Sequence, residues 1–212
     1  MKTETKINSL VGLMLLGSII TMAQASSDAL LKIQHQWAVC QYDISDENPK
    51  INCLKENIIV NENALKNTPE SNELKTWLAI NISTMAGVKG GLGALSLAKE
   101  SKVLLEEVIA SDPTVLDGSA YTSLGSLYYQ VPGWPIGFGD DDTAEIMLKK
   151  ALELNPDGID PNYFYADFLQ QDGRKKEAIE YFKHAQLATP RLSRPLADKG
   201  RLQEINNKLK EL

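Results

Sequence analysis

The sequence predicts an all-α protein built of stacked antiparallel helical hairpins. Three amphipathic segments each close on a proline, at Pro113, Pro156 and Pro190. Pro156 and Pro190 are 34 residues apart, and Pro113 and Pro156 are 43 apart, which is the same period with an insertion of nine residues. A repeat of this length is a pair of helices that cannot bury its apolar face alone and stacks on its neighbours. Such a stack forms a superhelix with a concave binding surface.

Composition agrees with this fold class. The chain has 212 residues, of which 43% are hydrophobic, enough for one domain with a substantial core. Leucine, alanine, lysine and glutamate are abundant, whereas alternating runs of β-branched residues are scarce, which favours helices over sheets. The formal net charge of −6 argues against broad nucleic-acid binding, so we expect no nucleic-acid partner.

Residues 1–25 have the pattern of a cleavable signal peptide. Two lysines precede an apolar run over residues 10–20, and residues 23–25 (AQA) match the small-residue cleavage pattern. We expect cleavage after Ala25, export, and a periplasmic location. The alternative is an uncleaved anchor, but this run is short for a bilayer, which needs about 20 apolar residues. Ser26 stands where a bacterial lipoprotein would need cysteine, so we expect neither a lipid anchor nor a membrane span after cleavage.

Residues 26–70 are expected to form an N-terminal helical hairpin that contains both cysteines. Cys40 and Cys53 flank a polar stretch typical of a turn between two helices. In an oxidising compartment we expect a disulfide between them, which would stabilise the fold by about 3 kcal/mol. The alternative is a redox-active or metal-binding pair. Against it stand the lack of a C-x-x-C motif and the unsuitable positions of His35 and His184.

Residues 71–194 hold the expected repeats, at about 71–113, 118–156 and 160–190. The last repeat is the clearest, because Asp160 can cap a helix and the proline after it suits a first turn. Its two apolar stripes lie on either side of an Asp-Gly turn and recur at helical spacing: Tyr165, Ala166 and Leu169, then Ala178, Phe182 and Ala185.

The last repeat resembles the tetratricopeptide consensus. It has small residues at Ala166 and Ala178, an aromatic at Phe182 and a closing proline, but Asn162 stands where the consensus has tryptophan. The resemblance covers about residues 72–190 and implies a right-handed solenoid that binds a protein or a peptide. The preceding repeat carries matching residues: Tyr121, Leu124, Gly125, Tyr128, Ala144, Leu148, Ala151 and Pro156.

The first repeat is about eight residues longer than the last. Trp77 and Pro113 are 36 residues apart, and the corresponding distance in the last repeat is 28. We expect the extra residues in a flexible turn over residues 87–93 (GVKGGLG), because glycine clusters mark loops. The alternative is a phosphate-binding loop, which lacks the required order of glycines and lysine and has no preceding strand.

The loop over residues 131–142 (VPGWPIGFGDDD) is long for a helix-to-helix turn in this fold. Its prolines and glycines give it a defined backbone, and Trp134 between two prolines would suit contact with a partner. The alternative is that Trp134, Ile136 and Phe138 fold back and pack between repeats. Both hold if the loop packs on one edge and presents the other.

The three aspartates at the end of this loop could suggest a metal site. We favour a helix start instead, with Asp142 as the cap and Glu145 as the third helical residue. The run lacks the alternating oxygen ligands of an EF-hand, so we expect no metal.

The first helix of each pair is expected to face the concave groove. Positions beside the core stripe then line it, namely Leu78, Ile82, Met85, Thr122, Ser126, Tyr129, Tyr163, Asp167 and Gln170. This surface lacks the array of lysine, asparagine and arginine with which some tetratricopeptide domains hold a peptide C-terminus. The residues predicted to bind a partner are Tyr129, Trp134, Phe138, Tyr163 and Asp167.

Residues 195–212 are expected to form a C-terminal capping helix, which solenoids need at their ends. We find no catalytic constellation in the chain. The two histidines are far apart in sequence, and no hydrolase, zinc-protease or kinase motif is present. We therefore expect no enzymatic activity and no cofactor.

The function predicted from these patterns is that of an exported scaffold that binds a protein or peptide in the bacterial cell envelope. The alternative is a periplasmic component that binds a small organic acid in support of a transporter. The middle repeat resembles helical-repeat components associated with tripartite (TRAP) transporters, and a pocket lined by Tyr129, Trp134 and Tyr163 would suit such a ligand. A third alternative is a protein that self-associates without an outside partner.

Overall fold

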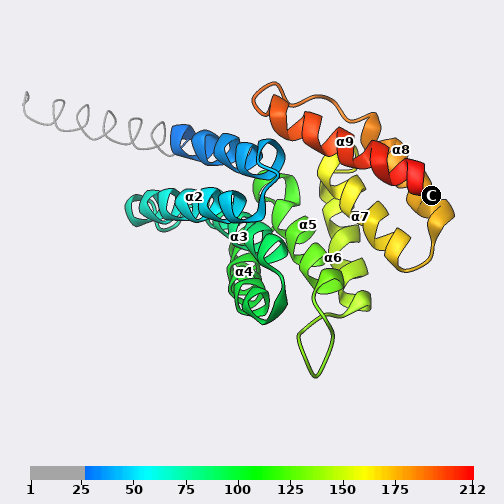
Figure 1. The fold of residues 1–212 in the computed structure, drawn as a ribbon, viewed down its shortest axis with the longest axis horizontal. Helices are drawn as coiled ribbons and strands as arrows, with labels where there is room; N and C mark the ends of the chain where they lie inside the picture. Colours follow the sequence, from blue (N-terminus) through cyan, green and yellow to red (C-terminus); the bar gives the residue numbers. More distant parts are fainter. Residues whose placement is uncertain (1–26) are drawn as a thin grey trace, which may run out of the picture.

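The computed structural model describes residues 27–212, and the regular elements in this range are all helices (Figure 1). The predicted all-α class is therefore confirmed, while the expected signal peptide lies outside the described residues. The chain begins with a helix over residues 27–38 that continues into the π-helical turn η1 (Val39–Asp43). The helices that follow are α2 (Glu47–Asn67), α3 (Asn72–Lys89), α4 (Gly91–Ser111), α5 (Val115–Gln130), α6 (Asp141–Leu154), α7 (Ile159–Gln171), α8 (Lys175–Gln186) and α9 (Pro195–Glu211).

Consecutive helices pack as antiparallel pairs, α3 with α4, α5 with α6, and α7 with α8. Small residues lie where the two helices of a pair meet. Ala144, Ala166 and Ala178 are fully buried, and a Cβ on Gly125 would come within 2.7 Å of Leu148. The apolar stripes predicted from the repeat pattern therefore form the core, as interiors are packed too closely to admit larger side chains at these positions.

The expected flexible turn over residues 87–93 is wrong. Helix α3 continues to Lys89 and α4 begins at Gly91, so the turn is centred on Gly90, whose φ of 60° favours glycine. The extra residues of this repeat lengthen its helices, which have 18 and 21 residues against 13 and 12 in α7 and α8. Packing between α3 and α4 outweighs the poor helix propensity of glycine.

The predicted disulfide between Cys40 and Cys53 is confirmed. It joins η1 to α2 with a Cα–Cα distance of 5.6 Å, and the Gln36 amide donates a hydrogen bond to the Cys53 Sγ at 3.3 Å. A disulfide is consistent with an oxidising environment. Within residues 27–212, no helix combines the length and apolarity needed to cross a membrane.

Helix α9 connects the two ends of the solenoid. It follows α8 in the chain, yet its residue Ala197 packs in the N-terminal core with Trp37 and Cys40. A Cβ on Gly200 would overlap the Tyr42 ring, so the helix and η1 are in direct contact. Figure 1 shows this return, with α9 (red) reaching the end of the first helix (blue). Helix α9 and η1 therefore lie side by side, although they come from opposite ends of the described chain.

Candidate functional site

A pocket of about 520 Å³ lies on the concave side, between the two ends of the solenoid. Its walls come from the first helix, α3, α5, the start of α7, and the segment between α8 and α9. The apolar part of the wall includes Trp37, Trp77, Ile80 and Phe164. A concave, partly apolar pocket with a few convergent polar groups is the usual form of a ligand site.

One face of α5 gives the pocket a row of hydroxyl groups. Ser119, Thr122, Ser123 and Ser126 follow the i, i+3, i+4, i+7 spacing of one helix face, and all four line the pocket. Ser119 and Ser126 donate to backbone carbonyls of their own helix at 2.6 and 2.8 Å. The hydroxyl of Ser123 makes no hydrogen bond to any residue of the described chain and can serve a ligand.

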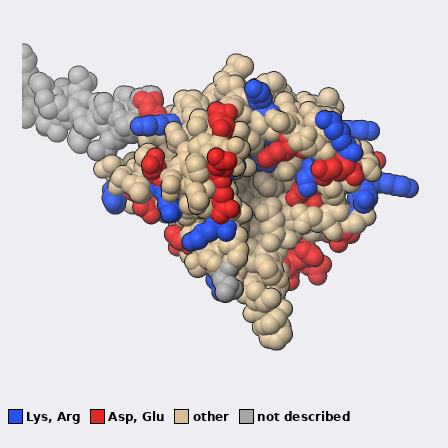
Figure 2. Space-filling view, in the orientation of Figure 1, with Lys and Arg blue, Asp and Glu red and all other residues tan. Residues whose placement is uncertain are grey.

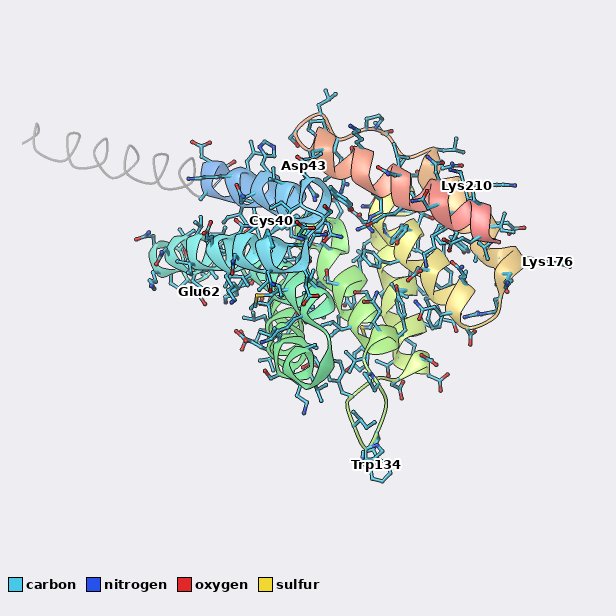
Figure 3. All side chains as sticks on the ribbon, viewed as in Figure 1. Cys40, Asp43, Glu62, Trp134, Lys176 and Lys210 are labelled. Carbon is cyan, nitrogen blue, oxygen red and sulfur yellow. A yellow bond between two sulfur atoms is a disulfide. The ribbon has the colours of Figure 1, made fainter. Side chains whose placement is uncertain are left out.

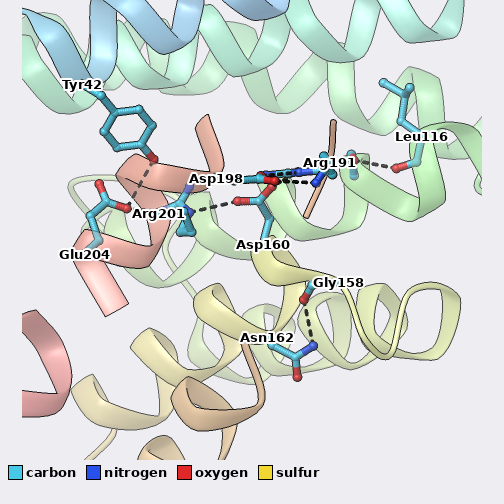
Figure 4. A network of polar contacts seen from close by, with 10 residues as sticks. Tyr42, Leu116, Gly158, Asp160, Asn162, Arg191, Asp198, Arg201 and Glu204 are labelled. Atoms are coloured by element: carbon cyan, nitrogen blue, oxygen red, sulfur yellow. Dashed lines mark hydrogen bonds and ion pairs between the residues drawn. The ribbon is translucent and has the colours of Figure 1, made fainter. Parts of the chain in front are cut away.

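Asp160 is the centre of an ionic network at one side of the pocket (Figure 4). Its carboxylate accepts from Arg191 Nη1 at 2.6 Å and from Arg201 Nε at 2.9 Å. Arg191 also pairs with Asp198 at 2.6 Å, and Arg201 with Glu204 at 2.5 Å. Burial alone would raise the pKa of Asp160, but the neighbouring guanidinium groups outweigh it and hold that pKa well below its usual range.

Arg194 lines the same pocket but lacks such a partner. Within the described chain, its side chain forms no ion pair, and its Nε is buried without an acceptor. Its guanidinium lies 4.7 Å from the centre of the Trp77 ring, in cation–π contact. Burial lowers the pKa of Arg194 to about 10, so the group remains charged at neutral pH. A buried donor without an acceptor is costly, and the Nε of Arg194 is such a donor, which makes Arg194 a candidate for binding an anion.

The backbone at the start of α5 adds a second unusual feature to the pocket wall. Leu116 and Asp117 have φ angles of 49° and 54°, and they are the non-glycine residues with positive φ among residues 27–212. Both line the pocket. Side chains in this left-handed region are uncommon, and such conformations concentrate at functional sites.

The loop between α5 and α6 lies away from the pocket and projects from the body of the molecule, and its residues 131–139 include no charged side chain (Figure 2). Phe138 packs edge-on against Tyr128 at 5.6 Å, and Lys102 lies over both rings. Trp134 is 90% exposed and points outward at the tip (Figure 3). The loop therefore packs on one edge and presents the other, which combines the two interpretations that the sequence left open.

Internal hydrogen bonds hold this loop in shape. Gly137 N donates to Gly133 O at 3.1 Å, and Gly139 N donates to Pro132 O at 3.0 Å. A Cβ on Gly139 would collide with the Val131 carbonyl oxygen, so only glycine allows this approach. The exposed tryptophan is thus carried on a defined backbone.

Tyr129 and Asp167, predicted to contact a partner, bond to each other. The Tyr129 hydroxyl donates to Asp167 Oδ2 at 2.8 Å, and Lys208 pairs with Asp167 Oδ1 at 2.7 Å. Burial, with the negative charge of Asp167, raises the pKa of Tyr129 well above its ordinary value. This network joins α5, α7 and α9, and so holds the C-terminal half of the molecule together.

The expected pocket of Tyr129, Trp134 and Tyr163 is not formed. Tyr163 is 8% exposed and stacks under the Arg201 guanidinium at 4.1 Å, whereas Trp134 stands at the loop tip. None of the three lines the 520 Å³ pocket. The prediction placed these residues together because it had no information on how far the loop projects.

The predicted groove lining is correct for two of the three residues on α5 and wrong on α3 and α7, because Tyr129, Tyr163, Asp167 and Gln170 do not line the pocket. Thr122 and Ser126 line the pocket, but the α3 residues that do so are Trp77, Ile80, Ser83 and Thr84. The expected α3 residues, Leu78, Ile82 and Met85, are buried in the core instead. The prediction therefore assigned the wrong face of α3 to the groove. The additional residues in α3 made the alignment of this repeat with the other two inaccurate.

The cap of α6 also differs from the expectation. Asp140, and not Asp142, is the N-cap, and its carboxylate accepts from the Thr143 backbone amide at 2.7 Å. At the next helix, Asp160 lies in the first turn while Gly158 is the N-cap. Across residues 27–212, no group of three or more histidine, cysteine, aspartate or glutamate residues is arranged to hold a metal ion.

The sequence reasoning missed the residues that give the pocket its charge. Arg201 belongs to the expected capping helix, and Arg191 and Arg194 had no predicted role, yet all three line the pocket and Arg201 is buried. One signal was present in the sequence, because Arg201 occupies the same face of α9 as the apolar Ala197 and Ile205, at helical spacing. Basic residues on an apolar stripe indicate an internal partner.

Comparisons with known proteins support the repeat architecture. Residues 159–191 match the family model of the tetratricopeptide repeat. The fold is similar to that of TTC0263, a thermophilic TPR protein in Thermus thermophilus, with a TM-score of 0.55 and 20% identity over 76% of this chain and 81% of that one. MamA aligns with a TM-score of 0.46 and 20% identity over 76% of this chain and 86% of that one. No protein of curated function matches the sequence.

Proposed function

We propose that this protein is an exported helical-repeat scaffold that binds another protein, or a peptide segment of one, in the bacterial cell envelope. The observation that carries the proposal is Trp134, 90% exposed at the tip of an internally hydrogen-bonded loop. An exposed tryptophan held on a rigid backbone offers a large contact area at low entropic cost, which is the character of an interface hot spot.

The repeat architecture and the disulfide support this role. Stacked helical hairpins of the tetratricopeptide type commonly serve as surfaces for protein association. The Cys40–Cys53 disulfide fits an oxidising compartment such as the periplasm. Residues 1–25 would supply the export signal, with cleavage after Ala25.

We assign different roles to the five residues proposed for partner binding. Trp134 would bury its ring on the partner, and Phe138 would fix the loop against α5. Tyr129, Tyr163 and Asp167 would act indirectly, because their contacts hold α5, α7 and α9 in place.

The test is an in-cell crosslinking pull-down with wild type, Trp134→Ala and Leu187→Ala. Leu187 is 81% exposed at the end of α8, so its variant controls for the loss of an exposed apolar side chain elsewhere. We expect one specific protein that is recovered with wild type and Leu187→Ala and lost with Trp134→Ala. Equal recovery with all three would contradict a role for the loop. Recovery of this chain alone would instead favour self-association.

The second candidate is a component that binds a small organic acid in support of a transporter. It is favoured by the pocket of about 520 Å³, whose walls come from the first helix, α3, α5 and the segment between α8 and α9. A carrier of this kind would be stabilised by its ligand, because binding to the folded state alone raises the melting temperature. A melting temperature that rises with an organic acid, in a protein that recovers no protein partner, would favour this candidate over the scaffold.

A further inference from the structure

Three arginines line the concave pocket, and they differ in how their charges are compensated. Arg191 has two carboxylate partners, Asp160 and Asp198, and Arg201 is paired with Asp160 and Glu204. Arg194 forms no ion pair with any residue that the structure describes, and its Nε is buried without an acceptor. The pocket wall therefore carries one guanidinium that has no ion-pair partner within the described chain and whose Nε lacks an acceptor.

An anion bound at Arg194 would supply the acceptor that its Nε lacks. The planar guanidinium presents a fork of N–H donors that matches a carboxylate in a bidentate pair. The Trp77 ring, 4.7 Å away, restrains the guanidinium from one side. The group is thus held in place before a ligand arrives, which reduces the entropy lost on binding.

Two further polar groups face the same pocket without partners. Gln34 on the first helix is 9% exposed, and its amide makes no hydrogen bond to another described residue. Ser123 on α5 likewise has a free hydroxyl. The polar atoms of both side chains are open to solvent, so they are available to a ligand. Their convergence with Arg194, from three separate parts of the chain, indicates a ligand with polar oxygens.

The acidic residues of the pocket form no ion pair with Arg194, although the negative charges of Asp160 and Asp198 oppose the lowering of its pKa by burial. Asp160 is already engaged by Arg191 and Arg201. Asp117 and Asp157 are exposed, and Asp157 pairs with His184 at 3.0 Å. Water screens exposed carboxylates far more strongly than it screens a partly buried guanidinium.

We propose that the concave pocket binds a small organic carboxylate, with Arg194 as the anchor of the carboxylate group. Gln34 and Ser123 bond the ligand's other oxygens, and its carbon skeleton lies against Trp77. A small molecule suits the pocket, because its volume of about 520 Å³ is within the range of small-molecule sites. This inference rests on the second candidate function and is independent of the Trp134 loop.

The test uses the purified chain with its disulfide intact and measures melting temperature and calorimetric binding. The probes are lactate, pyruvate, succinate and benzoate at millimolar concentration, each beside the corresponding neutral amide. The variants are Arg194→Gln, Arg194→Lys and, as a control of equal charge change, Lys183→Gln on the exposed surface of α8. A pentapeptide with a free or an amidated C-terminus tests the peptide as an alternative source of the carboxylate.

We expect at least one acid, and not its amide, to raise the melting temperature of wild type and of Lys183→Gln. Arg194→Gln should weaken its binding by about tenfold or more, and Arg194→Lys should lose less because it keeps the charge. Without ligand, Arg194→Gln should melt no lower than wild type, since it removes a buried charge that lacks a partner. A purely structural arginine would instead give a large fall in melting temperature with unchanged affinity.

The other outcomes distinguish a failure of Arg194 as the anchor from a failure of the small-molecule carrier as the function. Equal binding of acids by wild type and Arg194→Gln overturns the anchor and leaves the small-molecule carrier standing. Equal binding of acids and amides overturns the preference for an anion. Binding of the free peptide alone overturns the small-molecule ligand and places a peptide end in the pocket. No binding of any probe overturns both the anchor and the carrier.

Discussion

The aromatic ring of Tyr42 lies directly against the backbone of Gly200. A Cβ on Gly200 would meet three atoms of that ring, each closer than carbon atoms can approach. Tyr42 belongs to η1 near the start of the fold and Gly200 to α9 at its end. Together with the packing of Ala197 in the N-terminal core and the hydrogen bond between His35 Nε2 and the Ser193 carbonyl, this contact joins the two ends of the helical stack.

We therefore predict that Gly200→Ala separates α9 from η1. The added methyl group cannot be accommodated without moving the ring or the helix, and overpacking of this kind costs about 1–3 kcal/mol. Gly87→Ala is the matched control, because a Cβ there meets nothing within 4 Å and the residue lies inside α3. Chemical denaturation should show Gly200→Ala destabilised and Gly87→Ala unchanged or slightly more stable. Equal stability of the two variants would mean that the contact is not rigid.

The disulfide supports the same junction, since it ties η1 to α2. Its two cysteines are 13 residues apart, and closing a loop of that length stabilises a fold by about 3 kcal/mol. We predict that the double variant Cys40→Ser, Cys53→Ser loses about this amount in urea unfolding. Mild reductant should lower the stability of wild type to that of the variant and leave the variant itself unchanged. A reductant-insensitive wild type would contradict a stabilising role.

The sequence predicted the fold class because the repeat is a local signal. Helical periodicity and the closing prolines at Pro113, Pro156 and Pro190 are properties of short stretches, and packing agrees with them. The turn near Gly90 was predicted to be too long, because the glycines of residues 87–93 favour a loop whereas packing between α3 and α4 favours helix. Local preference is a weak guide where a long helix has a partner along its whole length.

The pocket could not be predicted from the same signals. Gln34, Trp77 and Arg194 are distant in sequence, and only the return of α9 to the first helix brings their segments together. That return includes the packing of the Tyr42 ring against Gly200, and a contact of this kind produces no periodic pattern in the sequence. The hydroxyl face of α5 was partly predicted, because Thr122 and Ser126 lie on one helix and needed no tertiary information.

Glu145 should make the stability of the C-terminal half depend on acid pH. Its carboxylate pairs with Arg174 and Lys149, each at 2.9 Å. Arg174 first, then Lys149, lowers the pKa of Glu145 from 4.5 to about 2. Because the folded pKa is depressed, the stabilisation is complete above the ordinary pKa and is lost as the pH falls from about 4.5 towards 2.

We predict that Glu145→Gln costs about 1 kcal/mol at neutral pH, a value reduced by solvent screening of the surface pair with Lys149. The cost should be mostly gone near pH 3, which urea unfolding at the two pH values would measure. Glu177→Gln on the exposed face of α8 is the control and should show little effect at either pH. A cost for Glu145→Gln that stays constant with pH would contradict the ion pair.

We predict that removing the carboxylate of Asp160 lowers the free energy of unfolding more than removing any other carboxylate of the described chain. Asp160→Asn leaves the guanidinium groups of Arg191 and Arg201 without a shared acceptor, and breaking a buried network of this kind costs about 3 kcal/mol. Asp172→Asn is the control, since its pair with Arg174 is 42% exposed on the carboxylate side and is worth about 0.5 kcal/mol. Similar losses for the two variants, measured by thermal unfolding, would show that the Asp160 network contributes no more than a surface pair.

The last prediction concerns the exposure of Trp134. The chain has three tryptophans, of which Trp37 and Trp77 are 7% and 3% exposed and Trp134 is 90% exposed. Iodide in the solvent should therefore quench mainly the emission of Trp134. Trp134→Ala should abolish most of this quenching and shift the remaining emission to the blue, while the free energy of unfolding changes by less than about 0.5 kcal/mol. If the ring folded back onto the repeats, wild type would resist quenching and Trp134→Ala would destabilise the protein, because removal of a buried aromatic side chain leaves a cavity.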